Sequence, residues 1–140
     1  MNYHIALCDD NTTDLEYVSA LVNEWQRNSQ NTVSINLFPS AESFLFHYEE
    51  DKKYDILLLD IEMGNMDGVE LAKKIREDNS TLQIVFITGF PDFIAEGYEV
   101  SALHYLMKPV SADKLSEVLD RAVIYLGKSE KSVIFTVNGE

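Results

Sequence analysis

The sequence has little cysteine and no long hydrophobic run. Its 140 residues include one cysteine, so an intramolecular disulfide is excluded, and Cys8 lies in an apolar run where a buried thiol is expected. No apolar run approaches the roughly twenty residues that a helix needs to cross a bilayer. The start, MNYHIALCDD, has neither the basic segment nor the cleavage site of a secretory signal. We therefore expect a cytoplasmic protein with no membrane partner.

Basic residues are also scarce. The chain has 24 acidic and 11 basic residues and a formal net charge of -13, so its surface should repel a polyanion such as DNA. Three scattered histidines without a cysteine pair exclude a zinc site of the usual kind. The glycines, among them Gly64, Gly68 and Gly89, form neither G-x-G-x-x-G nor a P-loop, which weighs against a flavin, dinucleotide or nucleotide site.

Apolar segments of strand length recur along the chain and alternate with segments of helical spacing. Since 46% of the residues are hydrophobic, one domain of this size can bury a core. The expected strands are residues 4–8, 33–38, 54–59, 82–87 and 104–107. The expected helices are residues 15–25, 41–48, 69–75, 92–100 and 115–126. Thr13 with Glu16 resembles a capping box for the first helix, and Ser40 is the expected N-cap of the second.

This alternation predicts an α/β fold with a doubly wound, five-stranded parallel sheet and five helices on its two faces. Alternation alone does not determine the strand order. The flavodoxin-like order 2-1-3-4-5 would place the first and third strands side by side at the switch point. Asp9, Asp10 and Asp60 would then be neighbours.

Each of four expected strands is followed by, or ends close to, a residue that can handle phosphate. These residues are Asp9 with Asp10, then Asp60, Thr88 and Lys108. Ligands of open parallel sheets bind outside the carboxyl ends of the strands, where these side chains would meet. Mg²⁺ prefers oxygen ligands and would relieve the repulsion among three carboxylates. An aspartate so neutralised can attack phosphorus, with a hydroxyl and an ammonium to hold the phosphoryl oxygens.

The chain changes character after residue 127. Residues 1–127 are expected to form the domain just described, and residues 128–140 a linker followed by a strand at residues 133–137. That strand would begin a further C-terminal domain, or else lie at the edge of the same sheet.

The segments IALCDDN, YDILLLDIEMGNMDG, IVFITG and HYLMKP resemble the four signature blocks of response-regulator receiver domains, the phosphoryl-accepting part of two-component signalling. The resemblance covers residues 3 to about 127. It implies that Asp60 is the phosphoacceptor, that Asp9 and Asp10 hold Mg²⁺, with Asp10 a direct ligand, and that the main-chain carbonyl of Glu62 is a further ligand.

The resemblance also assigns a switching role to residues at the other strand ends. It implies that Thr88 and Lys108 contact the phosphoryl group, that Tyr105 is the switch aromatic, and that the Lys108–Pro109 bond is cis. The sequence departs from the family at two positions. Gly64 stands where many receivers have proline, which would leave the loop after Asp60 less rigid, and Gly89 stands where alanine is usual.

The segments DIEMGNMDG and GFPDFIAEGYEVSALHYLMKP most resemble the corresponding segments of receivers of the LytTR class. For that class the resemblance implies a sensor histidine kinase as phosphodonor and dimerisation through the fourth helix, fifth strand and fifth helix. DNA would be bound only through a missing C-terminal domain in a transcriptional regulator. Such a receiver catalyses only its own phosphorylation and dephosphorylation.

Two other classes remain open. One is a phosphohydrolase with an aspartyl-phosphate intermediate, although Glu62 stands where such enzymes usually have a second aspartate. The other is an interaction module that is never phosphorylated, against which the full set of acidic, hydroxyl and lysine residues argues.

Overall fold

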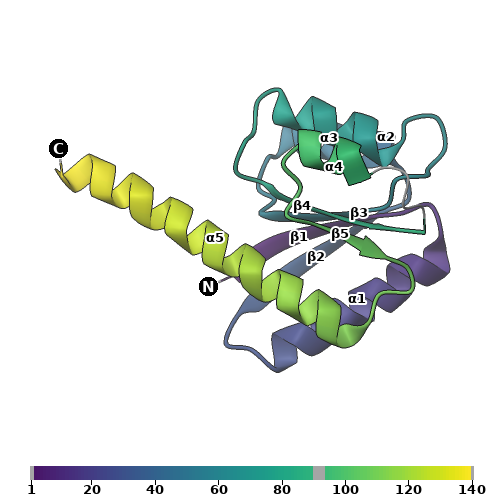
Figure 1. Ribbon diagram of the computed structural model, residues 1–140, viewed down its shortest axis with the longest axis horizontal. Helices are drawn as coiled ribbons and strands as arrows, with labels where there is room; N and C mark the ends of the chain where they lie inside the picture. The colour runs from purple at the N-terminus through teal and green to yellow at the C-terminus, as the bar shows by residue number, and fades with distance from the viewer. Residues whose placement is uncertain (1, 90–93, 140) are drawn as a thin grey trace.

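A parallel β-sheet forms the centre of the protein. The computed structural model describes residues 2–89 and 94–139, and of residues 94, 97 and 128–139 only the backbone. The strands run in the order β2-β1-β3-β4-β5, which confirms the expected topology (Figure 1). Their bounds are Asn2–Cys8 for β1, Thr32–Phe38 for β2, Ile56–Leu59 for β3, Gln83–Thr88 for β4 and His104–Met107 for β5.

Helices cover both faces of this sheet. The bounds are Thr12–Arg27 for α1, Ala41–Glu50 for α2, Gly68–Arg76 for α3, Ile94–Glu99 for α4 and Ala112–Gly139 for α5. Figure 1 shows α1 and α5 on one face and α2, α3 and α4 on the other. The doubly wound α/β class is therefore confirmed.

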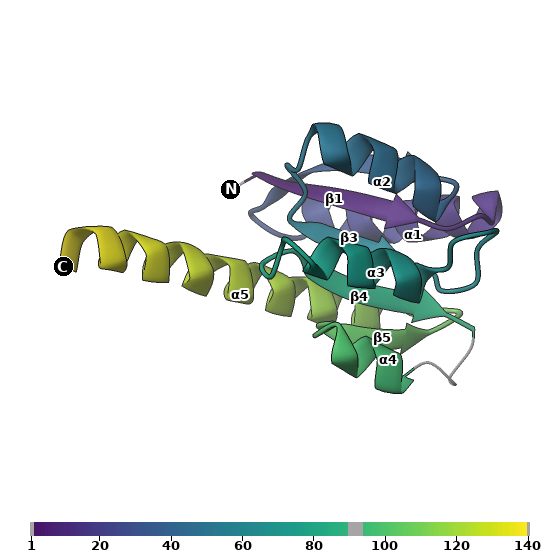
Figure 2. The same ribbon diagram turned by 90° about the horizontal axis from the view of Figure 1, so that it is seen from above.

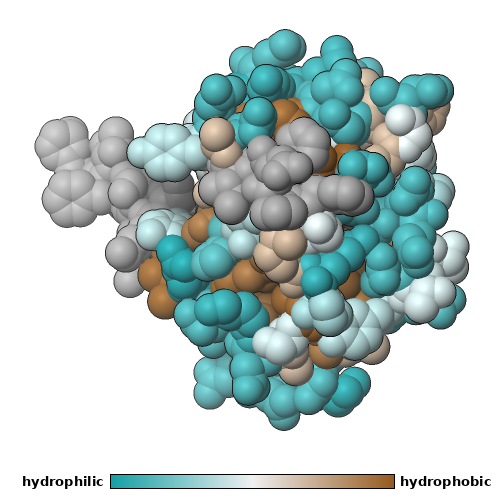
Figure 3. All heavy atoms as spheres, turned by 45° about the vertical axis from the view of Figure 1, so that its right-hand side comes forward, coloured by the Kyte–Doolittle hydropathy of each residue, from teal (hydrophilic) through white to brown (hydrophobic). Residues whose placement is uncertain are grey.

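The core consists of two apolar layers, one on each face of the sheet. Alternate residues of β3 enter different layers: Leu57 and Leu59 pack with residues of α2 and α3, whereas Ile56 and Leu58 pack with residues of α1 and α5. All four side chains are buried, as the uninterrupted apolar run of a central strand predicts. On the face drawn in Figure 3, hydrophilic residues predominate and hydrophobic ones show mainly in the recesses between them.

Side-chain caps determine where the first two helices begin. The side chain of Asn11 accepts a hydrogen bond from the N–H of Asp14 over 3.0 Å and is the N-cap of α1. The capping box expected at Thr13 was wrong, because the helix begins before that residue and Thr13 lies in its first turn. Ser40 is confirmed as the N-cap of α2, since its hydroxyl accepts a hydrogen bond from the N–H of Ser43 over 3.0 Å.

The C-terminal segment differs from the expectation. The strand expected at residues 133–137 is wrong, because α5 continues as a helix to Gly139 and extends beyond the sheet (Figure 2). Alternation over so short an apolar run does not separate strand from helix, and a helix satisfies its backbone hydrogen bonds without a neighbouring strand. The division of the chain at residue 127 stays a prediction.

The fourth helix ends one residue before the expected end at residue 100. It spans Ile94–Glu99, and the expected start at residue 92 lies outside the described residues. Among the helices that the structure describes, none combines the length and the apolarity needed to cross a membrane.

Candidate functional site

The carboxyl ends of β1 and β3 bring the first acidic residues together. The two strands are adjacent, with Cys8 opposite Leu59, so Asp9 and Asp60 follow at the same edge of the sheet. The N–H of Asp60 donates to the carbonyl of Cys8 over 2.9 Å, which continues the ladder by one residue. Asp9 and Asp60 are both buried, whereas Asp10 is exposed.

These three aspartates form a set of oxygens suited to a divalent cation. One carboxylate oxygen from each of Asp9, Asp10 and Asp60 lies within 4.8 Å of the others. Opposite ligands of an octahedral Mg²⁺, with bonds of 2.0–2.1 Å, are about 4 Å apart. Small side-chain rotations would therefore bring the three oxygens onto one ion, and the all-oxygen chemistry of the set is the kind that Mg²⁺ prefers. The three expected carboxylate ligands thus fit the ion.

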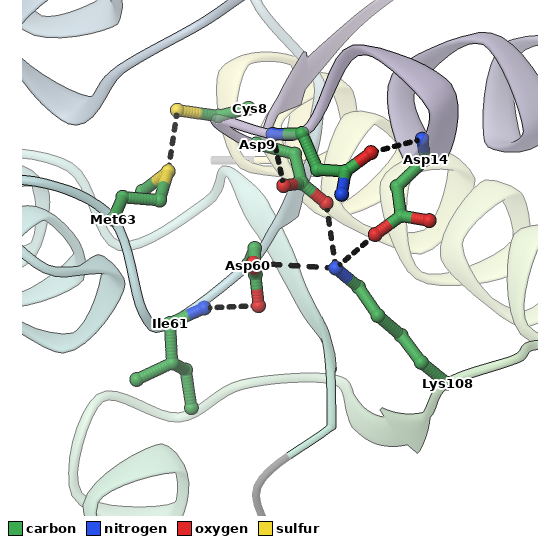
Figure 4. Close-up of polar contacts among 8 residues, drawn as sticks. Cys8, Asp9, Asp14, Asp60, Ile61, Met63 and Lys108 are labelled. Carbon is green, nitrogen blue, oxygen red and sulfur yellow. Dashed lines mark hydrogen bonds and ion pairs between the residues drawn. The ribbon is translucent and has the colours of Figure 1, made fainter.

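Lys108, which follows β5, reaches the same site. Its Nζ lies 2.8 Å from Oδ2 of Asp9, 2.7 Å from Oδ2 of Asp14 and 3.3 Å from Oδ2 of Asp60 (Figure 4). The lysine is placed there by β4, because its own N–H donates to the carbonyl of Thr88 over 2.8 Å. Residues from four parts of the chain therefore meet at one ammonium group.

Burial and charge determine the protonation of this cluster. Burial raises the pKa of Asp60 above its ordinary value of 3.8, and the charge of Asp9 raises it further, while Lys108 and the N–H of Ile61 partly offset the rise. Burial tends to lower the pKa of Lys108, but hydrogen bonds to Asp14 and Asp9 outweigh burial and the pKa is raised. The lysine is therefore cationic at neutral pH.

Cys8 precedes the acidic pair but is not a nucleophile. Burial and the nearby charges of Asp9 and Asp60 raise its pKa. Its Sγ lies 3.2 Å from the carbonyl oxygen of Ser40, as a thiol donor would. The thiol is buried and protonated, as expected from the sequence.

The loop after Asp60 is fixed by main-chain contacts. The N–H of Ile61 donates to Oδ1 of Asp60 over 2.8 Å, which orients the carboxylate. Gly68, the first residue of α3, lies directly against this loop, and its N–H donates to the carbonyl of Ile61 over 2.8 Å. A Cβ at Gly68 would overlap the carbonyl oxygen of Asp60, so the position needs glycine. Gly64 has a φ of 30°, which proline cannot adopt because its ring fixes φ near −65°.

The remaining expected residues lie near the same edge. Thr88 is the last residue of β4 and is fully buried, and Tyr105 in β5 is half-buried with its ring centroid 6.0 Å from that of Phe86. Glu62 is exposed two residues after Asp60. The Lys108–Pro109 bond is cis, as the resemblance implied.

Sequence reasoning missed Asp14 and Gly68. Asp14 lies in the first turn of α1, a few residues after Asp9 and Asp10, which follow β1 at this edge of the sheet. An acidic residue in that turn is a usable signal, because the first turn of such a helix faces the same edge of the sheet. Gly68 gave no signal, since its requirement comes from a backbone contact with Asp60.

This arrangement, three carboxylates and a lysine at the carboxyl ends of a 2-1-3-4-5 sheet, agrees with the comparison to known families. Residues 5–120 match the family described as the response regulator receiver domain. The chain belongs to this family. As a receiver domain it is 32% identical over 130 residues to the transcriptional regulatory protein NatR of Bacillus subtilis, a match that covers 91% of this chain and 52% of NatR. It is 25% identical over 146 residues to the sensory transduction protein LytT of Enterococcus faecalis, covering 98% of this chain and 58% of LytT.

Solved structures give the same fold. The response regulatory domain of mrkE from Klebsiella pneumoniae superposes on this receiver domain with a TM-score of 0.79 at 25% identity, covering 89% of this chain and 98% of that one. The relatives include LytT proteins and transcriptional regulators, which is consistent with the LytTR class expected from the sequence. The chain spans only about half the length of NatR and LytT.

Proposed function

We propose that Asp60 accepts a phosphoryl group from a phosphohistidine of a sensor histidine kinase, in the presence of Mg²⁺, and that this modification controls an effector. The observation that supports the proposal best is the pair of neighbours of the Asp60 carboxylate. Asp9 and Asp10 offer oxygens for a cation on one side, and Lys108 lies 3.3 Å away as a partner for phosphoryl oxygens. Phosphoryl transfer depends mostly on such positioning and neutralisation of charge.

In the proposed reaction an oxygen of Asp60 forms a bond to phosphorus. The bond from phosphorus to the imidazole nitrogen of the kinase breaks, and that nitrogen keeps the electron pair. Lys108 then donates to a phosphoryl oxygen as a point charge, and the hydroxyl of Thr88 donates to another. Nζ of Lys108 already lies 3.3 Å from Asp60, and Thr88 ends β4, the strand beside β3, so both residues stand at the same edge as the acceptor.

Asp9, Asp10 and Asp60 would hold the metal, with the main-chain carbonyl of Glu62 as a further ligand. When bound, Mg²⁺ offsets the charge of the carboxylates and of the incoming phosphoryl group. The buried Asp9 would remain in place during the reaction, because the N–H of Asn11 and the ammonium of Lys108 already hold its two oxygens.

The proposed output is a change at the surface formed by α4, β5 and α5. Thr88 and Tyr105 lie on the neighbouring strands β4 and β5, and we propose that the two residues shift together. We propose that the altered surface forms a homodimer and that the effector regulates transcription, because several relatives are named as transcriptional regulators. DNA would be bound by a C-terminal domain outside this chain, since the charge of -13 opposes binding by the receiver itself. We propose that the protein acts in the cytoplasm, because that is where ATP would phosphorylate the kinase that serves as its phosphodonor.

The test is the intact mass of the protein after incubation with acetyl phosphate and Mg²⁺. Wild type should gain one phosphoryl group, Asp60→Asn should gain none, and Asp78→Asn, which removes an exposed aspartate paired with Lys52, should behave as wild type. Equal gain by wild type and Asp60→Asn would show that the acceptor is another residue. We also propose that the chain is not an enzyme that acts on a separate substrate. Rapid release of phosphate from p-nitrophenyl phosphate that depends on Asp60 would instead support the phosphohydrolase alternative.

A further inference from the structure

We propose that Asp14 is a positioning residue that holds Lys108 toward α1 in the unphosphorylated protein and thereby restrains the lysine from moving to a phosphoryl group on Asp60. The inference rests on the proposed phosphorylation of Asp60. Besides the carboxylates of Asp9, Asp10 and Asp60, that of Asp14 would then influence the reaction, by determining the position of Lys108.

The inference begins from the contacts of the Lys108 ammonium group. An ammonium has three N–H donors, and the structure directs them to three carboxylates, those of Asp9, Asp14 and Asp60. The contact with Asp14 is 2.7 Å and that with Asp60 is 3.3 Å. Lys108 is therefore held more closely by Asp14 than by the expected phosphoacceptor (Figure 4).

Asp14 is itself fixed in place by the start of α1. Its N–H donates to the side chain of Asn11 over 3.0 Å, and it lies in the first turn of a helix of 16 residues. The N-terminal end of a helix favours a negative charge. The next residue, Leu15, is buried in the core, so the first turn of α1 cannot follow Lys108 toward Asp60.

Exposure decides which partner Lys108 releases. The side chain of Asp14 is 36% exposed, compared with 10% for Asp9 and 8% for Asp60. Asp14 also lines an open hollow of about 240 Å³ beside Tyr17 and Pro109, through which water can reach it. Water can replace Lys108 at Asp14, whereas a buried carboxylate without a partner is costly. The lysine thus exchanges Asp14 for a phosphoryl oxygen and keeps Asp9.

The test compares the initial rate of phosphorylation by acetyl phosphate, with Mg²⁺, in wild type, Asp14→Asn and Asp14→Ala. Loss of one part-exposed ion pair corresponds to about a two- to fivefold change, and the rate should rise by that factor in both variants. Glu16→Gln is the matched control, because it removes an exposed charge from the same helix at a residue that does not contact Lys108, and it should react as wild type. Thermal unfolding verifies that every variant is folded. If Asp14→Asn does not fold, the comparison with wild type uses Asp14→Ala alone.

A double-mutant cycle separates positioning from a general effect of charge. We expect the Lys108→Ala background to react more slowly than wild type, and in it Asp14→Asn should leave the rate unchanged. A rise of the same factor in both backgrounds, or no rise in either single variant at Asp14, would overturn the inference. If wild type is phosphorylated on Asp60 in the same experiment, the proposed function survives that result; if no variant is phosphorylated, the proposed function itself is wrong.

Discussion

The guanidinium Nε of Arg76 in α3 donates a hydrogen bond of 2.7 Å to the main-chain carbonyl of Val100, in the turn that joins α4 to β5. A second nitrogen of the same guanidinium lies 3.4 Å from the carbonyl of Ser101, which has a φ of 55°. One side chain thus joins the segment before β5 to the C-terminal end of α3. This segment lies next to the surface proposed to change on phosphorylation.

Replacement of Arg76 by alanine should destabilise the protein. The carbonyls that it holds would lose a charged donor, and we expect the free energy of unfolding to fall by about 1–3 kcal/mol. Arg76→Lys should recover little, because an ammonium cannot reproduce the geometry of the guanidinium. Urea unfolding monitored by circular dichroism measures the change. The exposed Lys74 on the same helix provides the control, and a loss at Lys74→Ala equal to that at Arg76→Ala would contradict the explanation.

Gly68→Ala should disturb the loop that carries Asp60. A methyl group at this position would overlap the carbonyl oxygen of Asp60, and main chain cannot move aside as a flexible side chain can. We expect a loss of about 1–3 kcal/mol in unfolding free energy, by analogy with overpacking, together with slower phosphorylation by acetyl phosphate. Gly89→Ala is the matched control, since no atom of the described residues lies within 4 Å of its added Cβ, and its unfolding free energy should stay close to that of wild type. Equal losses in the two variants would refute the role of the close contact.

The stability difference between Asp60→Asn and wild type should depend on pH. Because the pKa of Asp60 is raised on folding, its ionised form opposes folding, and this cost is present above the raised pKa. Asp60→Asn should therefore be more stable than wild type at pH 7. The advantage should shrink as the pH falls through the raised pKa and should be gone below the ordinary value of 3.8. Thermal unfolding of both proteins across this range is the measurement, and a difference that grows toward low pH would show that the sign is wrong.

Mg²⁺ should stabilise the folded protein through the aspartate cluster. A ligand that binds only the folded state adds about 2.7 kcal/mol at a concentration of one hundred times its Kd. We expect the melting temperature of wild type to rise with MgCl₂ and that of Asp10→Asn to respond far less, because Asp10 is the exposed member of the cluster and its loss leaves the core intact. Matched NaCl titrations control for ionic strength. An equal response of the two proteins to MgCl₂ would place the ion elsewhere.

The strands and the main site residues could be predicted because both follow from local chemistry. Apolar runs such as that of β3 are buried on both faces, and polar residues that directly follow them must meet at one edge of a parallel sheet. Asp60, Thr88 and Lys108 were found by this rule. No such rule gives the distances between the side chains of the site. Only the structure shows that Nζ of Lys108 lies closer to the carboxylate of Asp14 than to that of Asp60.

The features that escaped prediction depend on contacts between distant segments. Arg76 looks like an ordinary basic residue near a helix end, and only the folded chain brings Val100 to it. The requirement at Gly68 comes from the backbone of Asp60. In the C-terminal segment the failure was of another kind, because the alternation of a few apolar residues fitted a strand, whereas a helix that was already under way continued through them.

Lys108 contacts residues that lie far from it in the sequence, and this separation matters during protein synthesis. Its ammonium meets Asp9, which is 99 positions earlier, and Asp60, which is 48 positions earlier. A nascent polypeptide on the ribosome therefore has no complete pocket until nearly the whole receiver has emerged, and no proteolytic fragment that lacks either β1 or the residue after β5 retains one. A half-made or clipped molecule therefore lacks the full set of side chains around Asp60, and with it the response to phosphorylation proposed above.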